Sequence, residues 1–117
     1  MNRQVRSDIR SLMMHKLIAE KLKTNPQLWL IPQKNIDKWL EAGVCEVTYQ
    51  EWKNIFFNSS QDEIIEIITS DTENSKRLRS SSPFTGILSI IERNKFFLKH
   101  EEEMLKGKEN LLVLINL

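Results

Sequence analysis

Several residue types that mark particular classes of protein are scarce in this chain of 117 residues. Cys45 is the only cysteine, so no internal disulfide can form and a reducing compartment is expected. Three glycines and three prolines are few for a chain of strands and tight turns, which favours helices. The N-terminus lacks the apolar run of a signal peptide, and no segment approaches the roughly 20 apolar residues of a membrane span. We therefore expect a cytoplasmic protein without a membrane segment.

A strong charge of one sign is also missing, since 17 basic and 16 acidic side chains leave a net charge of +1. No global field therefore draws the protein to nucleic acid or to a membrane, although a local basic face remains possible. Apolar residues make up 40% of the chain and charged residues 28%, which is typical of a globular protein. A chain of this length is expected to form one domain around one core.

Patterns typical of catalysis and metal binding are absent as well. The histidines, His15 and His100, lie far apart and lack companion ligands, and the glycines form no phosphate-binding loop. Nothing around Cys45 marks an activated thiol. We interpret the histidines as surface or helix-packing residues and Cys45 as a small buried side chain. The sequence predicts a protein that is not an enzyme and has no cofactor or metal.

The chain does have regular helix patterning, beginning with a helix expected over about residues 7–23. This helix is apolar on two faces, so it is either a central core helix or offers one face to a partner. The two faces are formed by Val5, Ile9, Met13 and Leu17, and by Met14, Ile18 and Leu22.

A second helix is expected between a stop at Thr24 and a glycine at position 43. Asn25 is suited to its N-cap and Pro26 to its first position. Pro32 removes a backbone donor and should kink the helix or split it near Leu30. Gly43 suits a left-handed C-terminal cap.

Later helix starts are marked by the capping box, in which Ser or Thr is followed three residues later by Glu. The pattern occurs at residues 48–51, 60–63, 70–73 and 89–92. Val47 and Trp52 would add a hydrophobic staple to the first box. The isoleucine-rich run 64–68 also suits a strand, but its spacing favours a helix. A last helix is expected over about residues 90–106, with Ile91, Phe97 or Leu98, and Met104 or Leu105 facing inward.

These signals predict an all-α single domain of five or six short-to-medium helices with tight capped corners. The helical domain is expected to span residues 1–106 and to be followed by an apolar C-terminal tail at 107–117. The tail could pack on this chain, add a strand to a partner's sheet, or remain exposed.

The segment 77–88, Arg-Leu-Arg-Ser-Ser-Ser-Pro-Phe-Thr-Gly-Ile-Leu, resembles neither a helix interior nor a linker. Pro83 restricts Ser82 to an extended conformation, so the preceding helix should end by Ser81. Phe84 is expected to enter the core and pin the corner, and Gly86 to permit a conformation that other residues resist. Such a corner is either structural or a surface presented to a partner.

Basic residues gather around the start of this corner and on the helix that follows it. They are Lys76, Arg77, Arg79, Arg93 and Lys95. The group could hold phosphates through charge-assisted hydrogen bonds. Alternatively, the residues before the serines cap the end of the preceding helix and pair with nearby glutamates.

The chain resembles a family of small bacterial helical proteins over about residues 10 to 98. The matching residues are Arg10-Ser11-Leu12 with His15, Trp39, Glu51-Trp52, Leu78-Arg79, Ser81-Ser82-Pro83-Phe84, Gly86, Leu88 and Glu92-Arg93. The LRxSSPFxGxL segment is the most specific part of this resemblance. It implies the antitoxin-like partner of a toxin–antitoxin gene pair, in which the toxin can be nucleotidyltransferase-like.

We therefore expect a protein-binding module that neutralises a partner protein. The side chains expected to contact the partner are Arg10, His15, Arg77, Arg79, Ser81, Ser82 and Phe84. The alternatives are a DNA-binding regulator that uses the basic residues of the 76–95 region, and a structural adaptor or effector. The oligomeric state is left open.

Overall fold

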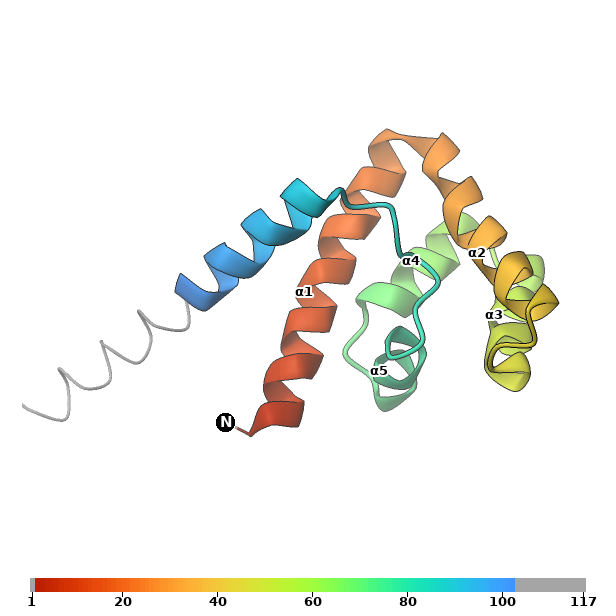
Figure 1. The fold of residues 1–117 in the computed structure, drawn as a ribbon, viewed down its shortest axis with the longest axis horizontal. Coiled ribbons are helices and arrows are strands. Elements are labelled where there is room, and N and C mark those ends of the chain that lie inside the picture. The colour runs from red at the N-terminus through yellow and green to blue at the C-terminus, as the bar shows by residue number, and fades with distance from the viewer. Residues whose placement is uncertain (1, 103–117) are drawn as a thin grey trace, which may run out of the picture. The chain divides into compact units, whose positions relative to one another are not determined.

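The computed structural model describes residues 2–102, which are helical for most of their length (Figure 1). The elements are α1 (Arg3–Thr24), the 3-10 helix η1 (Pro26–Trp29), α2 (Leu30–Glu41), α3 (Glu46–Asn58), α4 (Gln61–Thr69) and α5 (Glu73–Arg79). Residues 90–102 form a further helix. The expected all-α class is confirmed, since residues 2–102 contain no strand. The expected tail at 107–117 lies outside the described residues.

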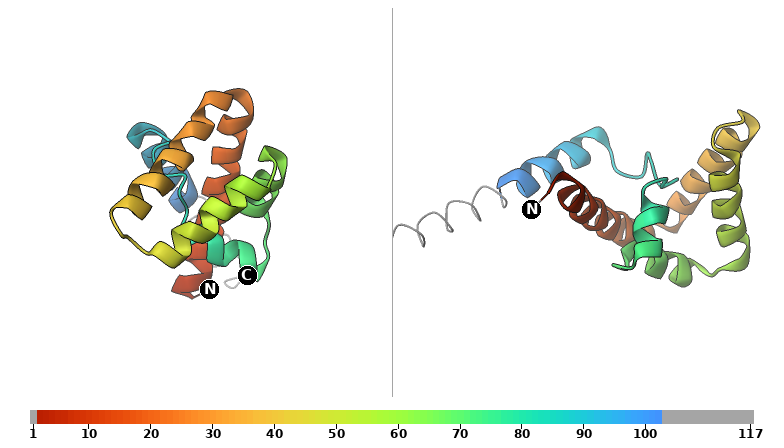
Figure 2. Two further views of the ribbon diagram at one scale, coloured as in Figure 1. Left: turned by 90° about the vertical axis from the view of Figure 1, so that its right-hand side faces the viewer. Right: turned by 90° about the horizontal axis from the view of Figure 1, so that it is seen from below.

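The chain divides into two compact units, Met1–Ile87 and Leu88–Leu117. In the first unit α1 packs against η1, α4 and α5, while α2 packs against α3 (Figure 2). The core of this unit is formed by Ile18, Ala19, Leu22, Trp29, Ile36, Trp52, Ile64, Ile68, Leu78, Phe84 and Ile87. Buried side chains thus come from every helix of the unit, so its packing depends on contacts distant in sequence.

α1 begins four residues earlier than the apolar spacing predicts. Asn2 acts as its N-cap, since the Asn2 side chain accepts a hydrogen bond of 2.8 Å from the Val5 amide. The face that carries Ile18 and Leu22 is buried. The other face is half open, with the side chains of Val5, Ile9, Met13 and Leu17 between 37% and 42% exposed.

The predicted split near Leu30 is confirmed, because η1 ends at Trp29 and α2 begins at Leu30. Pro32 lies in the first turn of α2, where its missing N–H costs no helical hydrogen bond. Gly43 has the expected left-handed conformation, with φ of +71°. The amides of Val44 and Gly43 donate to the carbonyls of Trp39 and Leu40, which completes a Schellman motif.

Two of the four expected capping boxes are confirmed. Ser60 and Glu63 exchange hydrogen bonds of 3.1 Å at the start of α4. Ser89 and Glu92 do the same, at 3.0 and 3.1 Å, ahead of the helix at 90–102. The isoleucine-rich run lies within α4, so its expected helical state is also confirmed.

The box at Thr48–Glu51 and its hydrophobic staple are wrong. α3 already begins at Glu46, after Cys45 turns the chain with φ of +43°, so Thr48 lies inside the helix. Val47 is 87% exposed and makes no staple. Cys45 is exposed on this short corner, contrary to the burial expected for it.

The box expected at Ser70–Glu73 is also wrong, because the N-cap of α5 lies two residues later, at Thr72. The Ser70 hydroxyl donates to the Glu66 carbonyl and so belongs to the end of α4. Thr72 is the N-cap of α5 and accepts from the Ser75 amide at 3.0 Å. Three hydroxyl or carboxyl side chains in a row left the cap position ambiguous in the sequence.

In the helix at 90–102, Phe97 is half-buried, as expected for an inward position. Ile91 and Leu98 are more than half exposed, so neither faces inward. The expected inward positions Met104 and Leu105 lie outside the described residues. Within residues 2–102 no helix combines the length and apolar character needed to cross a membrane.

Candidate functional site

The corner that follows α5 is fixed by backbone geometry. α5 ends at Arg79, and the amides of Ser81 and Ser82 close turns on the carbonyls of Leu78 and Arg79 at 3.2 Å. The helix therefore ends before Ser81, as the proline at position 83 requires. Gly86 has φ of +98°, a conformation that a side chain would strain.

Phe84 is buried in the core, as the sequence predicts, and its neighbours there are aromatic. Its side chain is only 1% exposed. Its ring centroid lies 6.0 Å from those of Trp52 and Phe56 and 6.2 Å from that of Trp29. The Trp29 and Trp52 rings meet it edge to face, a favourable arrangement for aromatic pairs. Phe84 thus joins η1 and α3 to the corner.

His15 ties α1 to the same corner from the other side. Its Nδ1 lies 2.7 Å from the Ser11 carbonyl and its Nε2 lies 2.7 Å from the Ser82 hydroxyl. A carbonyl can only accept, so Nδ1 carries the hydrogen and Nε2 accepts from Ser82. The Ser82 oxygen in turn accepts from the Phe84 amide at 3.3 Å. Burial lowers the pKa of His15 to about 4, despite the opposing hydrogen bond to Ser11.

Two further side chains hold the corner in place. The Ser81 hydroxyl accepts from the Trp52 indole N–H at 3.3 Å and donates to the Leu78 carbonyl. The Asn35 amide in α2 donates to the carbonyls of Pro83 and Thr85 at 2.8 and 2.9 Å. Sequence reasoning missed Asn35, because a polar residue within a helix carries no local signal of a distant partner.

The basic residues of α5 are engaged within the protein. Arg77 forms a two-pronged ion pair with Glu51, with both N–O distances at 2.8 Å, and this pair holds the pKa of Glu51 below its usual value. Lys76 lies 3.3 Å from Glu73 and 3.8 Å from Asp71. The interpretation of these residues as pairing with acidic neighbours is confirmed for both.

Arg79 is a helix-capping residue and is almost wholly buried, at 4% exposure. Its Nη1 donates to the Ser70 carbonyl at 2.6 Å and to the Ile68 carbonyl at 3.3 Å, both at the end of α4. These carbonyls have no partner within the helix, so Arg79 satisfies the C-terminus of α4.

The residues expected to contact a partner therefore divide into three groups. His15, Ser81, Ser82 and Phe84 come together in the corner and bond to one another or to the core. Arg79 is buried beneath the end of α4, and Arg10 is half-buried in α1. Arg77 is exposed. Of the seven, it offers the most accessible charged group.

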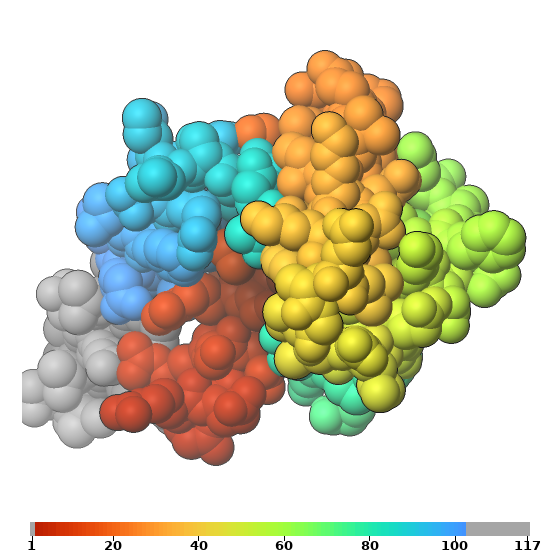
Figure 3. Space-filling view, turned by 45° about the vertical axis from the view of Figure 1, so that its right-hand side comes forward, coloured from red at the N-terminus to blue at the C-terminus, as the bar shows by residue number. Residues whose placement is uncertain are grey.

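A broad open groove runs along α2 and α3, and Arg77 lies on its wall. Figure 3 turns these helices, orange and yellow, toward the viewer. The groove has a volume of about 1310 Å³. Its lining residues are Asp37, Leu40, Glu41, Glu46, Val47, Gln50, Glu51, Lys53, Asn54 and Arg77. A smaller hollow of about 260 Å³ adjoins it, shares Asp37 and Lys53 with it, and is edged by Phe57.

The groove is acidic although the whole chain is nearly neutral. Lys53 pairs with Asp37 at 3.3 Å, and Arg77 pairs with Glu51. Among residues 2–102, Glu41 and Glu46 have no ion-pair partner, so two carboxylates face the groove uncompensated. Val47 and Phe57 add apolar surface, at 87% and 88% exposure.

No protein-family model matches this chain, and neither a curated protein nor a solved structure does. Across residues 2–102 no group of three or more His, Cys, Asp or Glu side chains could hold a metal ion.

Proposed function

We propose that this protein is a non-enzymatic protein-binding module that neutralises a partner protein in the manner of an antitoxin. Its contact surface is the groove along α2 and α3. The observation that carries the proposal is the exposure of Val47 and Phe57 at 87% and 88% on one helix, beside uncompensated carboxylates. Apolar surface of this kind, edged by polar groups, is typical of a protein contact.

The negative charge of the groove favours a partner with a basic surface. Glu41 and Glu46 would repel an acidic surface and attract a basic one, which gives both specificity and faster association. A protein that handles nucleotides carries basic groups where it binds phosphates. A nucleotidyltransferase-like toxin, the partner implied by the sequence resemblance, fits this description. The two carboxylates would then occupy positions otherwise taken by phosphates.

The corner that follows α5 contacts both helices that form the groove. Trp52 and Phe56 belong to α3, and both pack on Phe84. Asn35 belongs to α2 and bonds to the corner backbone. Both walls of the groove are therefore anchored to one rigid turn. Rigid presentation reduces the entropy lost on binding, which favours affinity.

The alternative of a DNA-binding regulator receives less support. Lys76 and Arg77 already pair with acidic side chains, and Arg79 is buried against backbone carbonyls. Phosphate contacts would have to replace these bonds. A titration against duplex DNA at two salt concentrations tests this alternative, since phosphate binding weakens steeply as salt rises.

The proposal is tested by co-expression with the product of the neighbouring gene, followed by pull-down and a growth assay. Complex formation and restored growth are expected for the natural sequence. Reversing two charges in Glu41→Lys/Glu46→Lys should weaken binding at least about tenfold, and Phe57→Ser should also weaken it.

The matched control is Glu66→Lys, a charge reversal at an exposed position on α4 outside the groove. It should leave binding unchanged. Absence of a complex together with absence of growth rescue would sink the proposal. A complex without rescue would instead indicate a structural adaptor.

A further inference from the structure

The groove along α2 and α3 has the size of a site for a segment of another protein. Its volume of about 1310 Å³ exceeds the roughly 300–1,000 Å³ of most small-molecule pockets. Both of its walls belong to the unit Met1–Ile87. α2 has 12 residues and α3 has 13, so each wall is about 18–20 Å long at a rise of about 1.5 Å per residue. A helical segment of three to four turns, as an order of magnitude, matches this length.

The uncompensated charge of the groove lies at the corner that joins α2 to α3. Four acidic and two basic side chains line the groove, and each basic one is paired with an acidic one. The two carboxylates without an ion-pair partner among residues 2–102 belong to Glu41, the last residue of α2, and Glu46, the first residue of α3. A segment that binds here therefore needs basic side chains at the end that meets this corner.

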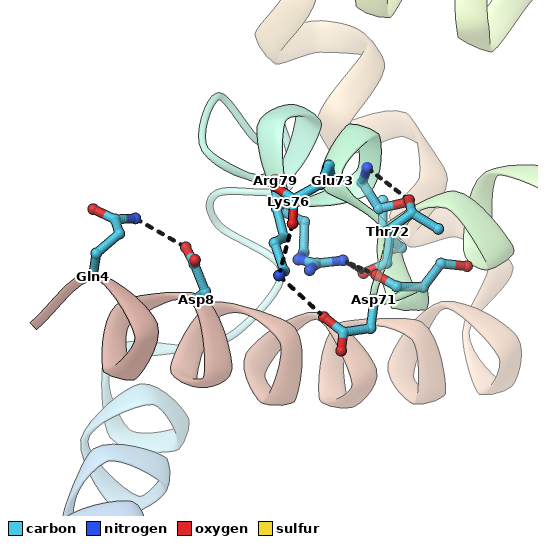
Figure 4. Close-up of polar contacts among 10 residues, drawn as sticks. Gln4, Asp8, Asp71, Thr72, Glu73, Lys76 and Arg79 are labelled. Carbon is cyan, nitrogen blue, oxygen red and sulfur yellow. Dashed lines mark hydrogen bonds and ion pairs between the residues drawn. The ribbon is translucent and has the colours of Figure 1, made fainter. Parts of the chain in front are cut away.

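The charged groups between α1 and α5, where a pocket of about 250 Å³ lies, are by contrast engaged with one another. Lys76 lies 3.3 Å from Glu73 and 3.8 Å from Asp71 (Figure 4). Asp8 accepts a 3.0 Å hydrogen bond from Gln4 on the same helix. A partner would have to break these contacts before it could form its own. The groove is better suited to a charged partner, because two of its carboxylates can form new ion pairs directly.

The end of the groove away from that corner offers an apolar binding point. The adjoining hollow of about 260 Å³ is lined by the buried Ile36, the half-buried Phe56 and the exposed Phe57. This volume is below the range of small-molecule sites and suits a single apolar side chain. Val47 and Phe57 are ten residues apart on α3, which places them about 15 Å apart along its axis. The groove thus joins a charged end to an apolar end.

A helix is the form of chain that suits a groove between two helices. Residues 2–102 contain no strand, so an extended segment would find no sheet edge to join. The residues through which α3 lines the groove and the hollow lie largely on one face of that helix. They include Glu46, Val47, Gln50, Lys53, Asn54 and Phe57. Side chains at such spacings form ridges into which the side chains of another helix can pack.

We propose that the groove receives an amphipathic helix of the partner protein. Basic side chains of that helix meet Glu41 and Glu46, and an apolar side chain enters the hollow beside Phe57. The inference rests on the proposed function, since it names the part of the partner that the groove holds. A second copy of this chain is less suitable, because two facing grooves would bring like charges together.

The test maps the partner segment by photo-cross-linking in the complex with the product of the neighbouring gene. The photoreactive amino acid benzoylphenylalanine replaces Val47 in one protein and Phe57 in another, and mass spectrometry identifies the labelled peptides. Both positions should label one partner segment, at sites about 8–12 residues apart, because a helix advances about 1.5 Å per residue. Lys or Arg should lie near the site labelled from Val47. The same replacement at Glu66, on α4 outside the groove, is the control and should label no partner residue.

The spacing of the labels decides between a helix and an extended segment. Sites only about five residues apart would indicate an extended segment, which advances about 3.3 Å per residue, and would overturn the inference. Labels in two separate partner segments, or on a second copy of this chain, would overturn it as well. In each of these outcomes a complex exists, so the proposed function still stands. Absence of any complex contradicts the proposed function itself and removes this inference with it.

A variant that fills the hollow gives a second measurement. Gln33→Trp places an indole at the exposed edge of the hollow without changing any charge, and should weaken binding of the partner at least about tenfold. Gln27→Trp is a matched change at an exposed position of η1, outside the groove and the hollow, and should leave binding unchanged. Equal affinity of the two variants would show that no partner side chain enters the hollow, and would overturn that assignment.

Discussion

The His15 imidazole is held as a neutral group, and this makes the stability of the protein depend on pH. Its pKa is about 4 in the folded state and 6.5 in the unfolded chain. Between these values the unfolded chain binds a proton that the folded protein does not, so acid favours unfolding. The contribution is fully present above pH 6.5 and is lost as the pH falls toward 4.

We predict that the free energy of unfolding falls by about 2 kcal/mol between pH 7 and pH 5 on account of His15 alone. Urea unfolding at several pH values measures this change. In His15→Gln the side chain does not titrate, so this part of the pH dependence should disappear. Identical pH profiles for the two proteins would show that His15 is not buried in the neutral form.

Phe84 and Phe57 offer the same side chain in opposite environments. Phe84→Ala should lower the free energy of unfolding by about 3–5 kcal/mol, because it leaves a cavity amid Trp29, Trp52 and Phe56. Phe57→Ala removes the same atoms from a position that is 88% exposed, and should change stability by less than about 0.5 kcal/mol. Equal losses in the two variants, measured by urea unfolding, would contradict the placement of Phe84.

Among the helices, Ser60 and Thr48 both fit the capping-box pattern in the sequence, but only Ser60 caps a helix in the structure. Ser60→Ala should destabilise the protein by about 1 kcal/mol, since it removes the bond to the Glu63 amide. Thr48→Ala should have an effect below about 0.5 kcal/mol, because Thr48 lies inside α3. Thermal unfolding followed by circular dichroism compares them. A larger loss for Thr48→Ala would mean that α3 starts later than the structure has it.

The sequence predicts where a helix lies or ends wherever a few neighbouring residues determine it. Helical spacing places α4, Gly43 ends α2, and Pro83 ends α5 before Ser81. The pattern at Thr48–Glu51 is misleading because α3 already begins at Glu46, and Glu51 is paired with Arg77, 26 residues later. A capping box can be recognised within four residues, whereas an ion pair between α3 and α5 requires knowledge of the fold.

In the candidate site, too, features that depend on a short segment can be predicted from the sequence, whereas contacts between distant residues cannot. That Phe84 would be buried follows from its place as the large apolar residue of a polar corner. The sequence does not reveal that His15 bonds to Ser82, 67 positions away, or that Asn35 holds the corner backbone. The groove along α2 and α3 was also missed, because its walls become adjacent only when the helices pack.

At the scale of the whole molecule, the unit Met1–Ile87 contains its own core. Every helix from α1 to α5 contributes buried side chains to it. Its last residue is tied to α1, since the Lys21 ammonium donates to the Ile87 carbonyl at 3.2 Å. We predict that a protein ending at residue 87 folds cooperatively by itself.

Urea unfolding of this shortened protein, followed by tryptophan fluorescence and by circular dichroism, checks the prediction. One shared transition in both signals is expected, because the tryptophans lie within the unit. Loss of the transition would mean that residues 88–117 are needed to complete the core. A version that ends at residue 80 serves as a control and should not fold, since it lacks Phe84.

The position of Phe84 along the chain also determines when the protein can first become native on the ribosome. Trp29, Trp52 and Phe56 emerge from the exit tunnel well before their shared packing partner does. α1 likewise waits for Ser82 to complete the bonds of His15. Nascent chains up to about residue 80 therefore lack the ring on which all three of these aromatic side chains pack, and we expect them to expose more apolar surface than the folded protein does. We therefore expect complete folding to require that this corner has left the exit tunnel, and products terminated before it to be degraded more rapidly than the full chain.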